Sequence, residues 1–408
     1  MEVSSDDVAS PPVAWLRTWF FLISPASRVS ADAMYQVTSL GNDDSGNINN
    51  RGQVVVSSGY VGRIDEWVYN SRPTDPNAGP LVRARPSIPS GVANNSAFQY
   101  QLRSINDQGI VVAQGRDQGP TTFDANNPAN NAWDRPLIPG LSPPGANTAP
   151  PGQTRALGIN NHGDVVGASV LGSTLASHAF IYSNGKTTDL GTLGGTESVA
   201  LAINDAGQVV GHSNTTILND AGGGHGFIWQ NGVMQDLTPS DPTHQSVASA
   251  INASGLVAGQ AFYANGQYHA TIFNPTSGLA QDLGTLPGGT WSVASAINGK
   301  GQVVGVSVSD QGWEHAFLYS NGVMKDLNNL IPPNSTVTLS EARAINDLGQ
   351  IVVGGNNRSW LLTPSNLPAP TPPPFPEPVP EPSMVAVFGL AFAAIAYKSV
   401  RRAKTVSA

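Results

Sequence analysis

The sequence predicts an all-β fold, and within that class a β-propeller of about seven four-stranded blades. Two observations carry this prediction. A phrase consisting of Ile-Asn, a Gly three residues after the Asn and a following Val-rich run occurs seven times along the chain. The chain also contains 44 Gly and 32 Pro but only 12% charged residues. Such a composition suits many short strands joined by tight turns and argues against a helical bundle.

The seven copies of this phrase divide the chain into units of similar length. They begin at Ile48, Ile105, Ile159, Ile203, Ile251, Ile297 and Ile345. The steps between them are 57, 54, 44, 48, 46 and 48 residues. One four-stranded sheet cannot bury both of its apolar faces alone, and repeats of this length are typical of propeller blades that stack on one another. An open solenoid of stacked sheets is the alternative.

The unit from Ser198 to Leu237 illustrates the four strands of one blade. We expect strands at residues 198–203, 208–213, 225–230 and 233–237. The turn from Asn204 to Gly207 joins the first pair, because Asn and Asp hydrogen-bond the local backbone and Gly adopts a positive φ. The dipeptide Asn231-Gly232 joins the last pair and is the strongest short hairpin signal.

The two ends of the repeat region predict how the ring closes. The seventh unit offers three strands, at 343–345, 350–354 and 360–363, and then enters a proline-rich stretch. The segment Tyr35–Gly41 matches the fourth-strand pattern of Lys186–Gly191. We therefore expect the N-terminal strand to complete the last blade, which removes an exposed sheet edge.

Two phrases in the middle of the chain carry a family resemblance. His178-Ala179-Phe180 and His315-Ala316-Phe317, together with the segment 189–195, resemble the bacterial extracellular HAF repeat family. The resemblance is clear over about 150–330 and weaker over 35–149, where the first two units carry long insertions. It implies a propeller-like domain over 34–363 that is secreted or lies at the cell surface, and it implies no defined activity.

Residues 1–33 differ from the repeats and predict a degenerate signal or leader segment. Arg17 precedes a short apolar run at 19–23, and Ala31-Asp32-Ala33 offers a small-residue cleavage site before Met34. Against this, Pro25 lies close behind the apolar run and the first residues are acidic. A disordered tail or a misassigned start codon is the alternative.

The C-terminal end predicts a sorting segment. A proline-rich spacer at 364–379 leads to 380–408, which begins with the motif Pro380, Glu381, Pro382 and Ser383. Uncharged residues 384–397 follow, and then a basic end formed by Lys398, Arg401, Arg402 and Lys404. As a helix, these 14 residues would span ~21 Å, which is short of the ~30 Å hydrocarbon core and suits a transient membrane anchor.

This order of motif, apolar segment and basic end resembles the PEP-CTERM sorting signal of Gram-negative bacteria. The resemblance implies an exosortase-type membrane peptidase as partner and export through the inner membrane, with the basic end held inside. A plain single-pass tail anchor and an amphipathic helix on the membrane surface are the alternatives.

The third strands contain His residues that could suggest a metal site, but their spacing predicts a structural role. Equivalent positions in neighbouring blades lie ~10 Å apart, whereas zinc ligands lie ~2 Å from one ion, so we expect no metal. With a two-residue hairpin, His225 lies diagonally from Asp236 on one face of the sheet. We expect structural hydrogen bonds in the pairs His178–Asp189, His225–Asp236 and His315–Asp326.

Composition and motifs exclude several classes of function. A net charge of −8, with no basic block before the C-terminus, argues against a nucleic-acid partner. The absence of cysteine excludes disulfides and thiolate sites. We found no calcium-loop spacing, phosphate loop or nucleophile elbow, and we expect no cofactor and no enzymatic activity.

The remaining expectation is a structural or ligand-binding role. Seven arginines concentrate in the first two units, at positions 63, 72, 83, 85, 103, 116 and 135. They suggest a ligand face for an anionic extracellular polysaccharide on one side of the ring, although drift in loosely constrained surface loops is the favoured explanation. The alternative function is a propeller-type carbohydrate-active enzyme, which would need a pair of carboxylates in one pocket.

Overall fold

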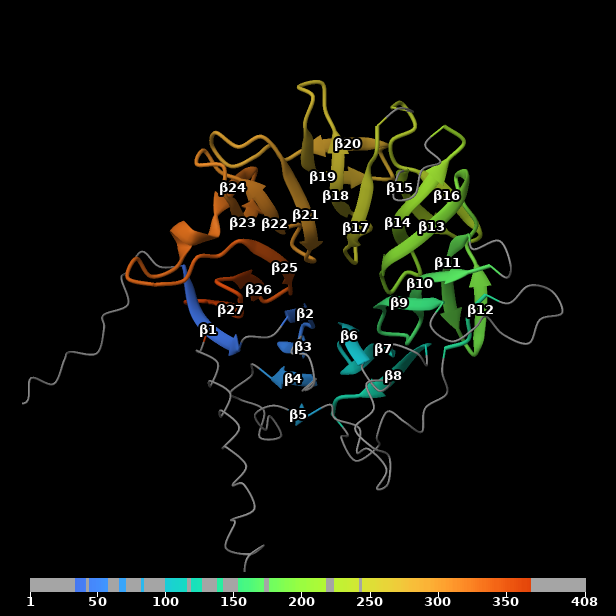
Figure 1. Cartoon of the computed structure of the whole chain (residues 1–408), viewed down its shortest axis with the longest axis horizontal. Coiled ribbons are helices and arrows are strands. Elements are labelled where there is room, and N and C mark those ends of the chain that lie inside the picture. The colour runs from blue at the N-terminus through green and yellow to red at the C-terminus, as the bar shows by residue number, and fades with distance from the viewer. Residues whose placement is uncertain are drawn as a thin grey trace, which may run out of the picture.

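Seven antiparallel sheets surround a common axis in the computed structural model of the chain (Figure 1). Six sheets have four strands, and the sheet β6–β7–β8 has three among the described residues. The structure describes residues 34–41, 44–57, 66–70, 82–83, 100–115, 119–126, 138–141, 153–171, 176–217, 224–241 and 244–367. The predicted all-β propeller is therefore correct, and the open solenoid is not what the chain forms.

The first three blades follow the chain in order. Blade 1 contains β2 (Asp44–Ile48), β3 (Gln53–Ser57), β4 (Glu66–Asn70) and β5 (Val82–Arg83). Blade 2 contains β6 (Tyr100–Ile105), β7 (Ile110–Gly115) and β8 (Gly119–Asp124). Blade 3 contains β9 (Thr154–Ile159), β10 (Val165–Val170), β11 (Ser177–Ser183) and β12 (Lys186–Asp189).

The next three blades repeat this arrangement. Blade 4 contains β13 (Gly194–Ile203), β14 (Val209–Thr215), β15 (His225–Gln230) and β16 (Val233–Asp236). Blade 5 contains β17 (Val247–Ile251), β18 (Val257–Phe262), β19 (Tyr268–Asn274) and β20 (Leu279–Asp282). Blade 6 contains β21 (Ser292–Ile297), β22 (Val303–Val308), β23 (Glu314–Ser320) and β24 (Val323–Asp326), followed by the 3-10 helix η2 (Leu327–Leu330).

Blade 7 combines both ends of the repeat region. Its inner strands are β25 (Glu341–Ile345), β26 (Ile351–Gly355) and β27 (Arg358–Pro364). Its outer strand is β1 (Tyr35–Gly41), which pairs antiparallel with β27 from Tyr35 opposite Pro364 to Gly41 opposite Ser359. The predicted closure by the N-terminal strand is confirmed. The outer edge of β27 is thereby covered, as sheet proteins require of long edges.

The hairpins between third and fourth strands follow the predicted Asn-Gly chemistry. Asn184, Asn231 and Asn321 have φ values of 51°, 51° and 52°, and the glycines after them also have positive φ. Two successive residues with positive φ form a tight turn whose twist matches that of the flanking strands. In blade 4, Phe227 therefore lies opposite Asp236, as the loop length predicts. The strand β13 is longer than expected, because Gly194 already pairs with Thr215.

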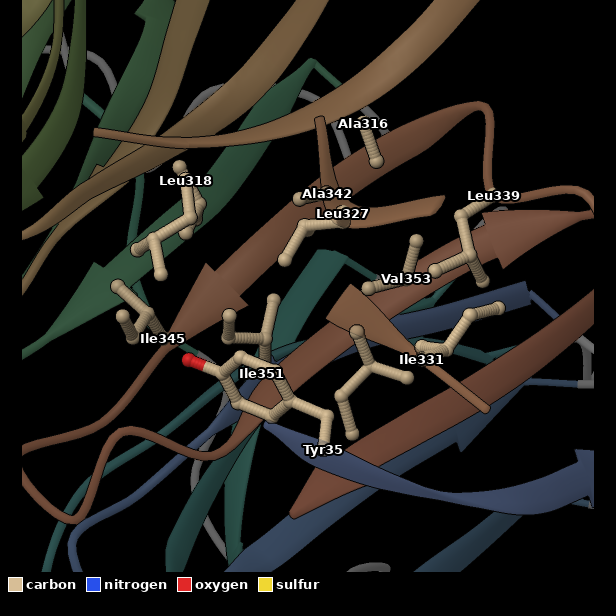
Figure 2. Packing of buried hydrophobic residues seen from close by; sticks show 12 residues of the cluster. Tyr35, Ala316, Leu318, Leu327, Ile331, Leu339, Ala342, Ile345, Ile351 and Val353 are labelled. Atoms are coloured by element: carbon tan, nitrogen blue, oxygen red, sulfur yellow. The ribbon is translucent and has the colours of Figure 1, made fainter. Parts of the chain in front are cut away.

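Seven apolar clusters fill the seven spaces between neighbouring blades. Each cluster combines buried residues of two adjacent blades, as when Ala179 of blade 3 packs with Phe227 of blade 4. Figure 2 shows the cluster between blades 6 and 7, to which β1 contributes Tyr35, β26 contributes Ile351 and η2 contributes Leu327. Burial of both sheet faces in this way is what a single blade cannot achieve alone.

Candidate functional site

The seven Ile-Asn phrases meet at the axis of the propeller, where their asparagines form a closed ring. Each Asn Nδ2 donates to the main-chain oxygen of the Asn in the next blade, at 2.8–3.2 Å. The ring consists of Asn49, Asn106, Asn160, Asn204, Asn252, Asn298 and Asn346. The last bond, from Asn346 to Asn49, joins residues that are 297 positions apart. We call this set the Asn ring.

The local turn fixes each member of the Asn ring. In blade 4, Asn204 Oδ1 accepts from the backbone N–H of Ala206 at 3.1 Å and of Gln208 at 3.0 Å. Its Nδ2 donates to Gln208 Oε1 at 2.8 Å in addition to the next blade. These side chains are only 3–6% exposed. The Asn therefore orders its own turn and links two blades at the same time.

A cavity of about 230 Å³ opens at the axis over the Asn ring. Its lining comes from the same three residues of every blade: the Ile, the Asn and the residue after the Asn. We call the last of these the mouth residues. They are Asn50, Asp107, Asn161, Asp205, Ala253, Gly299 and Asp347. The Ile and Asn are the same in all seven blades, so only the mouth residues can make this cavity specific.

All three mouth carboxylates accept hydrogen bonds from a neighbouring blade, and in two of them both oxygens are used. Asp107 accepts from the Asn50 N–H at 2.7 Å and from the Asn50 side chain at 3.1 Å. Asp205 accepts from the Asn161 N–H at 2.8 Å and from its side chain at 2.9 Å. These bonds make Asp107 and Asp205 links between blades, with both oxygens of each used.

The His and Asp residues that the sequence pairs do lie together, at the outer hairpins. His178 Nδ1 lies 3.0 Å from Asp189, and His225 and His315 each lie 2.7 Å from Asp236 and Asp326. All three pairs join the third and fourth strands of one blade. The third and fourth strands are the outer strands of each sheet, so the pairs lie away from the axis. Each pair belongs to a different blade, and the three pairs do not form a cluster.

A fourth pair escaped sequence reasoning. His269 Nδ1 lies 2.9 Å from Asp282 in blade 5. The residues are 13 positions apart, whereas the other pairs are 11 apart. The longer loop Pro275–Gly278 replaces the Asn-Gly turn here, so the fixed-spacing rule failed. Counting back from the strand register would have found it, because Thr271 lies opposite Asp282.

The aspartates of these pairs also tie the fourth strand to the crossing toward the next blade. Asp236 Oδ1 accepts from the Thr238 N–H at 2.7 Å, and Asp189 accepts from the Gly191 N–H at 2.8 Å. Burial raises the pKa of Asp189, but hydrogen bonds from His178 and Gly191 outweigh this and leave the pKa below its ordinary value. The pairs thus hold the outer hairpin and the interblade crossing.

The pH dependence of folding is expected to report the His225–Asp236 pair. The hydrogen bond to Asp236 raises the pKa of His225 despite its burial. The stabilisation is therefore present below the unfolded pKa of ~6.5 and lost as pH rises through the folded pKa. His225→Gln should lower the free energy of unfolding by about 1–3 kcal/mol at pH ~6 and flatten this decline, as measured by urea unfolding across the window.

The matched control for His225→Gln is His162→Gln, at an exposed turn position outside every His–Asp pair. The control should keep the slope of the parent protein. Equal slopes for parent and His225→Gln would show that the pair does not couple protonation to folding.

The sorting motif at Pro380–Ser383 and the basic end at 398–404 lie outside the described residues, as do the spacer and the segment 1–33. Among the residues that the structure does describe, none belongs to a helix long and apolar enough to cross a bilayer. The same residues contain no group of three His, Cys, Asp or Glu side chains placed to hold a metal ion. Of the seven arginines in the first two units, only Arg103 has a described side chain.

The fold is similar to those of solved propellers. Oligogalacturonate lyase from Vibrio parahaemolyticus is 8% identical, with a TM-score of 0.50 over 82% of this chain and 92% of that chain. An oligogalacturonate lyase in complex with manganese is 9% identical, with a TM-score of 0.50 over 82% and 94%. The β-propeller domain of the Trilobed protease from Pyrococcus furiosus is 11% identical, with a TM-score of 0.48 over 72% and 84%.

At such low identities the likeness shows the fold alone. No protein-family model and no curated protein sequence matches the chain.

Proposed function

We propose that this propeller binds a ligand, with saccharide as the ligand class, outside the cytoplasm of a Gram-negative bacterium. The single observation that supports binding is the axial cavity, which is the place where all seven blades contribute side chains. The other repeated polar groups, the His–Asp pairs and the Asn ring, are used within and between blades. Among the residues that line the cavity, only the mouth residues vary between blades.

We propose a binding role in preference to the alternative of a carbohydrate-active enzyme. A glycosidase needs two available carboxyl groups that flank the bond to be cleaved. In the axial cavity, both oxygens of Asp107 and of Asp205 already accept hydrogen bonds from neighbouring blades. This favours a structural role for these two carboxylates over a role as general acid and base.

The sequence features at the ends support an extracellular location and an exosortase-type partner. The motif Pro380–Ser383, the uncharged segment 384–397 and the basic end occur in the order of a sorting signal. In this proposal the C-terminal segment is a transient anchor that is removed after export. Mass spectrometry of the exported protein tests this, since a mature chain that retains Arg401 and Arg402 would show that no cleavage occurs.

Saccharide binding is tested with the full-length protein on a glycan array that spans neutral, N-acetylated and uronic-acid oligosaccharides. We expect a subset of glycans to bind, and deletion of the gene to alter a biofilm or surface phenotype. An array without any bound glycan would overturn the saccharide proposal.

A further inference from the structure

The mouth residues form an incomplete circle of hydrogen bonds around the axis. In five blades, the backbone N–H of the mouth residue donates to a side-chain oxygen of the next mouth residue, at 2.6–2.9 Å. The donors are Asn50, Asp107, Asn161, Gly299 and Asp347. An N–H at the axis is therefore normally capped by the following blade.

The circle is broken on one side, at blades 4 and 5. The mouth residues that follow Asp205 and Ala253 are Ala253 and Gly299, which have no side-chain oxygen. Within the part of the chain that the structure describes, the N–H groups of Asp205 and Ala253 have no hydrogen-bond acceptor. Beyond Gly299, Asp347 Oδ1 accepts from the Gly299 N–H at 2.6 Å. Its Oδ2 has no donor among the same residues.

The gap therefore presents two N–H donors and one carboxylate oxygen to a cavity. Polar groups without a protein partner at the open mouth of a cavity can bind a ligand that supplies the complementary atoms. A cation cannot accept from the two N–H groups. An anion can accept from them but meets the negative charge of Asp107, Asp205 and Asp347 around the same mouth. The complementary ligand is uncharged and both accepts and donates hydrogen bonds.

The chain itself shows which chemistry closes this circle. Asn161 Oδ1 accepts from the Asp107 N–H at 2.8 Å, while its Nδ2 donates to Asp205 at 2.9 Å. Asn50 does the same between Asp347 and Asp107. An amide thus bridges an N–H on one side and a carboxylate on the other. Sugar hydroxyls and the acetamido group of an amino sugar offer the same pair of functions.

We propose that the gap between Asp205 and Asp347 binds the uncharged terminal unit of a saccharide. This inference rests on the proposed ligand-binding function and gives it a site and a charge preference. The cavity volume of about 230 Å³ is smaller than the roughly 300–1,000 Å³ of drug-sized pockets, so it suits one sugar unit at a chain end. The isoleucines that also line the cavity provide apolar contact for the C–H faces of the ring.

Ala253→Asn tests the proposal because it supplies the missing oxygen from within the chain. The new side chain should accept from the Asp205 N–H, as Asn161 does for Asp107, and so occupy one of the two open donors of the gap. Titration calorimetry of the full-length protein would use diacetylchitobiose, cellobiose and digalacturonate as probes. We expect the parent to bind a neutral probe and not digalacturonate. We expect Ala253→Asn to weaken that binding at least tenfold and to raise Tm.

Ala280→Asn is the matched control, because it makes the same change on the exposed outer strand of the same blade. It should leave binding unchanged. Neutral-probe binding that survives in Ala253→Asn would overturn the gap as the site while leaving saccharide binding intact. Preference for digalacturonate would overturn the uncharged class. If Ala253→Asn folds poorly, Ala253→Asp, which copies the mouth residue of blades 2, 4 and 7, answers the same question.

Discussion

Replacing Asn204 with Ala is expected to lower the free energy of unfolding by about 3 kcal/mol or more. The side chain is 6% exposed and makes four hydrogen bonds, two through Oδ1 and two through Nδ2. Its loss removes four hydrogen bonds that contribute about 0.5–1.5 kcal/mol each, and it leaves the N–H groups of Ala206 and Gln208 without their side-chain acceptor. Guanidinium unfolding monitored by tryptophan fluorescence measures the change.

The neighbouring residue provides the control. Asp205 lies in the same turn but is exposed, and among the described residues its carboxylate accepts hydrogen bonds only from Asn161. We expect Asp205→Ala to cost no more than about 1 kcal/mol, because exposed polar interactions contribute little. A second variant, Asn204→Asp, keeps the acceptor and removes the donor, and should fall between the two. If Asn204→Ala unfolds at the same denaturant concentration as the parent, the Asn ring contributes no net stability.

The architecture was predictable from the sequence because it depends on local, repeated signals. Seven Ile-Asn phrases, the Asn-Gly hairpins and the strand pattern of Tyr35–Gly41 each describe a segment of a few residues. The resulting blades and the closure by β1 follow from them. The His225–Asp236 pair was predictable for the same reason, since hairpin length alone sets its register.

The axial site was not predicted, because its contacts join residues from different blades. In each phrase the Asn and the residue after it read as turn residues, and that interpretation is correct as far as it goes. Their second role exists only once the ring closes, as in the bond between Asn346 and Asn49. Comparing the residue after each Asn would have revealed Ala253 and Gly299 as exceptions, but not that they are neighbours on a cavity.

The glycine of the Val-rich run yields the other large expected effect. Gly259 in β18 lies so close to β17 that a Cβ atom there would be 1.8 Å from the carbonyl oxygen of Val247. A Cβ atom at Gly211 would lie 1.9 Å from the carbonyl oxygen of Val199, and one at Gly305 would lie 2.0 Å from that of Val293, each in the first strand of the same blade. Because the obstacle is backbone, the two strands must separate at the bulge between Ala248 and Ala250 to admit a side chain.

Gly259→Ala is therefore expected to destabilise the fold by about 3 kcal/mol, at the upper end of overpacking in a core. Gly266→Ala in the following hairpin is the control. That glycine has a φ of +80°, and no atom lies within 4 Å of the position that a Cβ atom would occupy. Its cost of about 1–2 kcal/mol therefore arises from backbone conformation alone. Thermal and urea unfolding of both variants compare steric overlap with conformational strain in one blade.

Blades 2 and 7 indicate that the cost of Gly259→Ala depends on the spacing between the first two strands of the blade. At the register position of Gly259 they hold Ala113 and Val353, which lie opposite Leu102 and Ala342. Both side chains are buried, so the first two strands must lie farther apart there than in blade 5. If Gly259→Ala proves as stable as Gly266→Ala, blade 5 can adopt that wider spacing at little cost. A large difference would show that the glycine sets how closely the strands of blades 3 to 6 approach, and with it how the axial strands meet at the cavity.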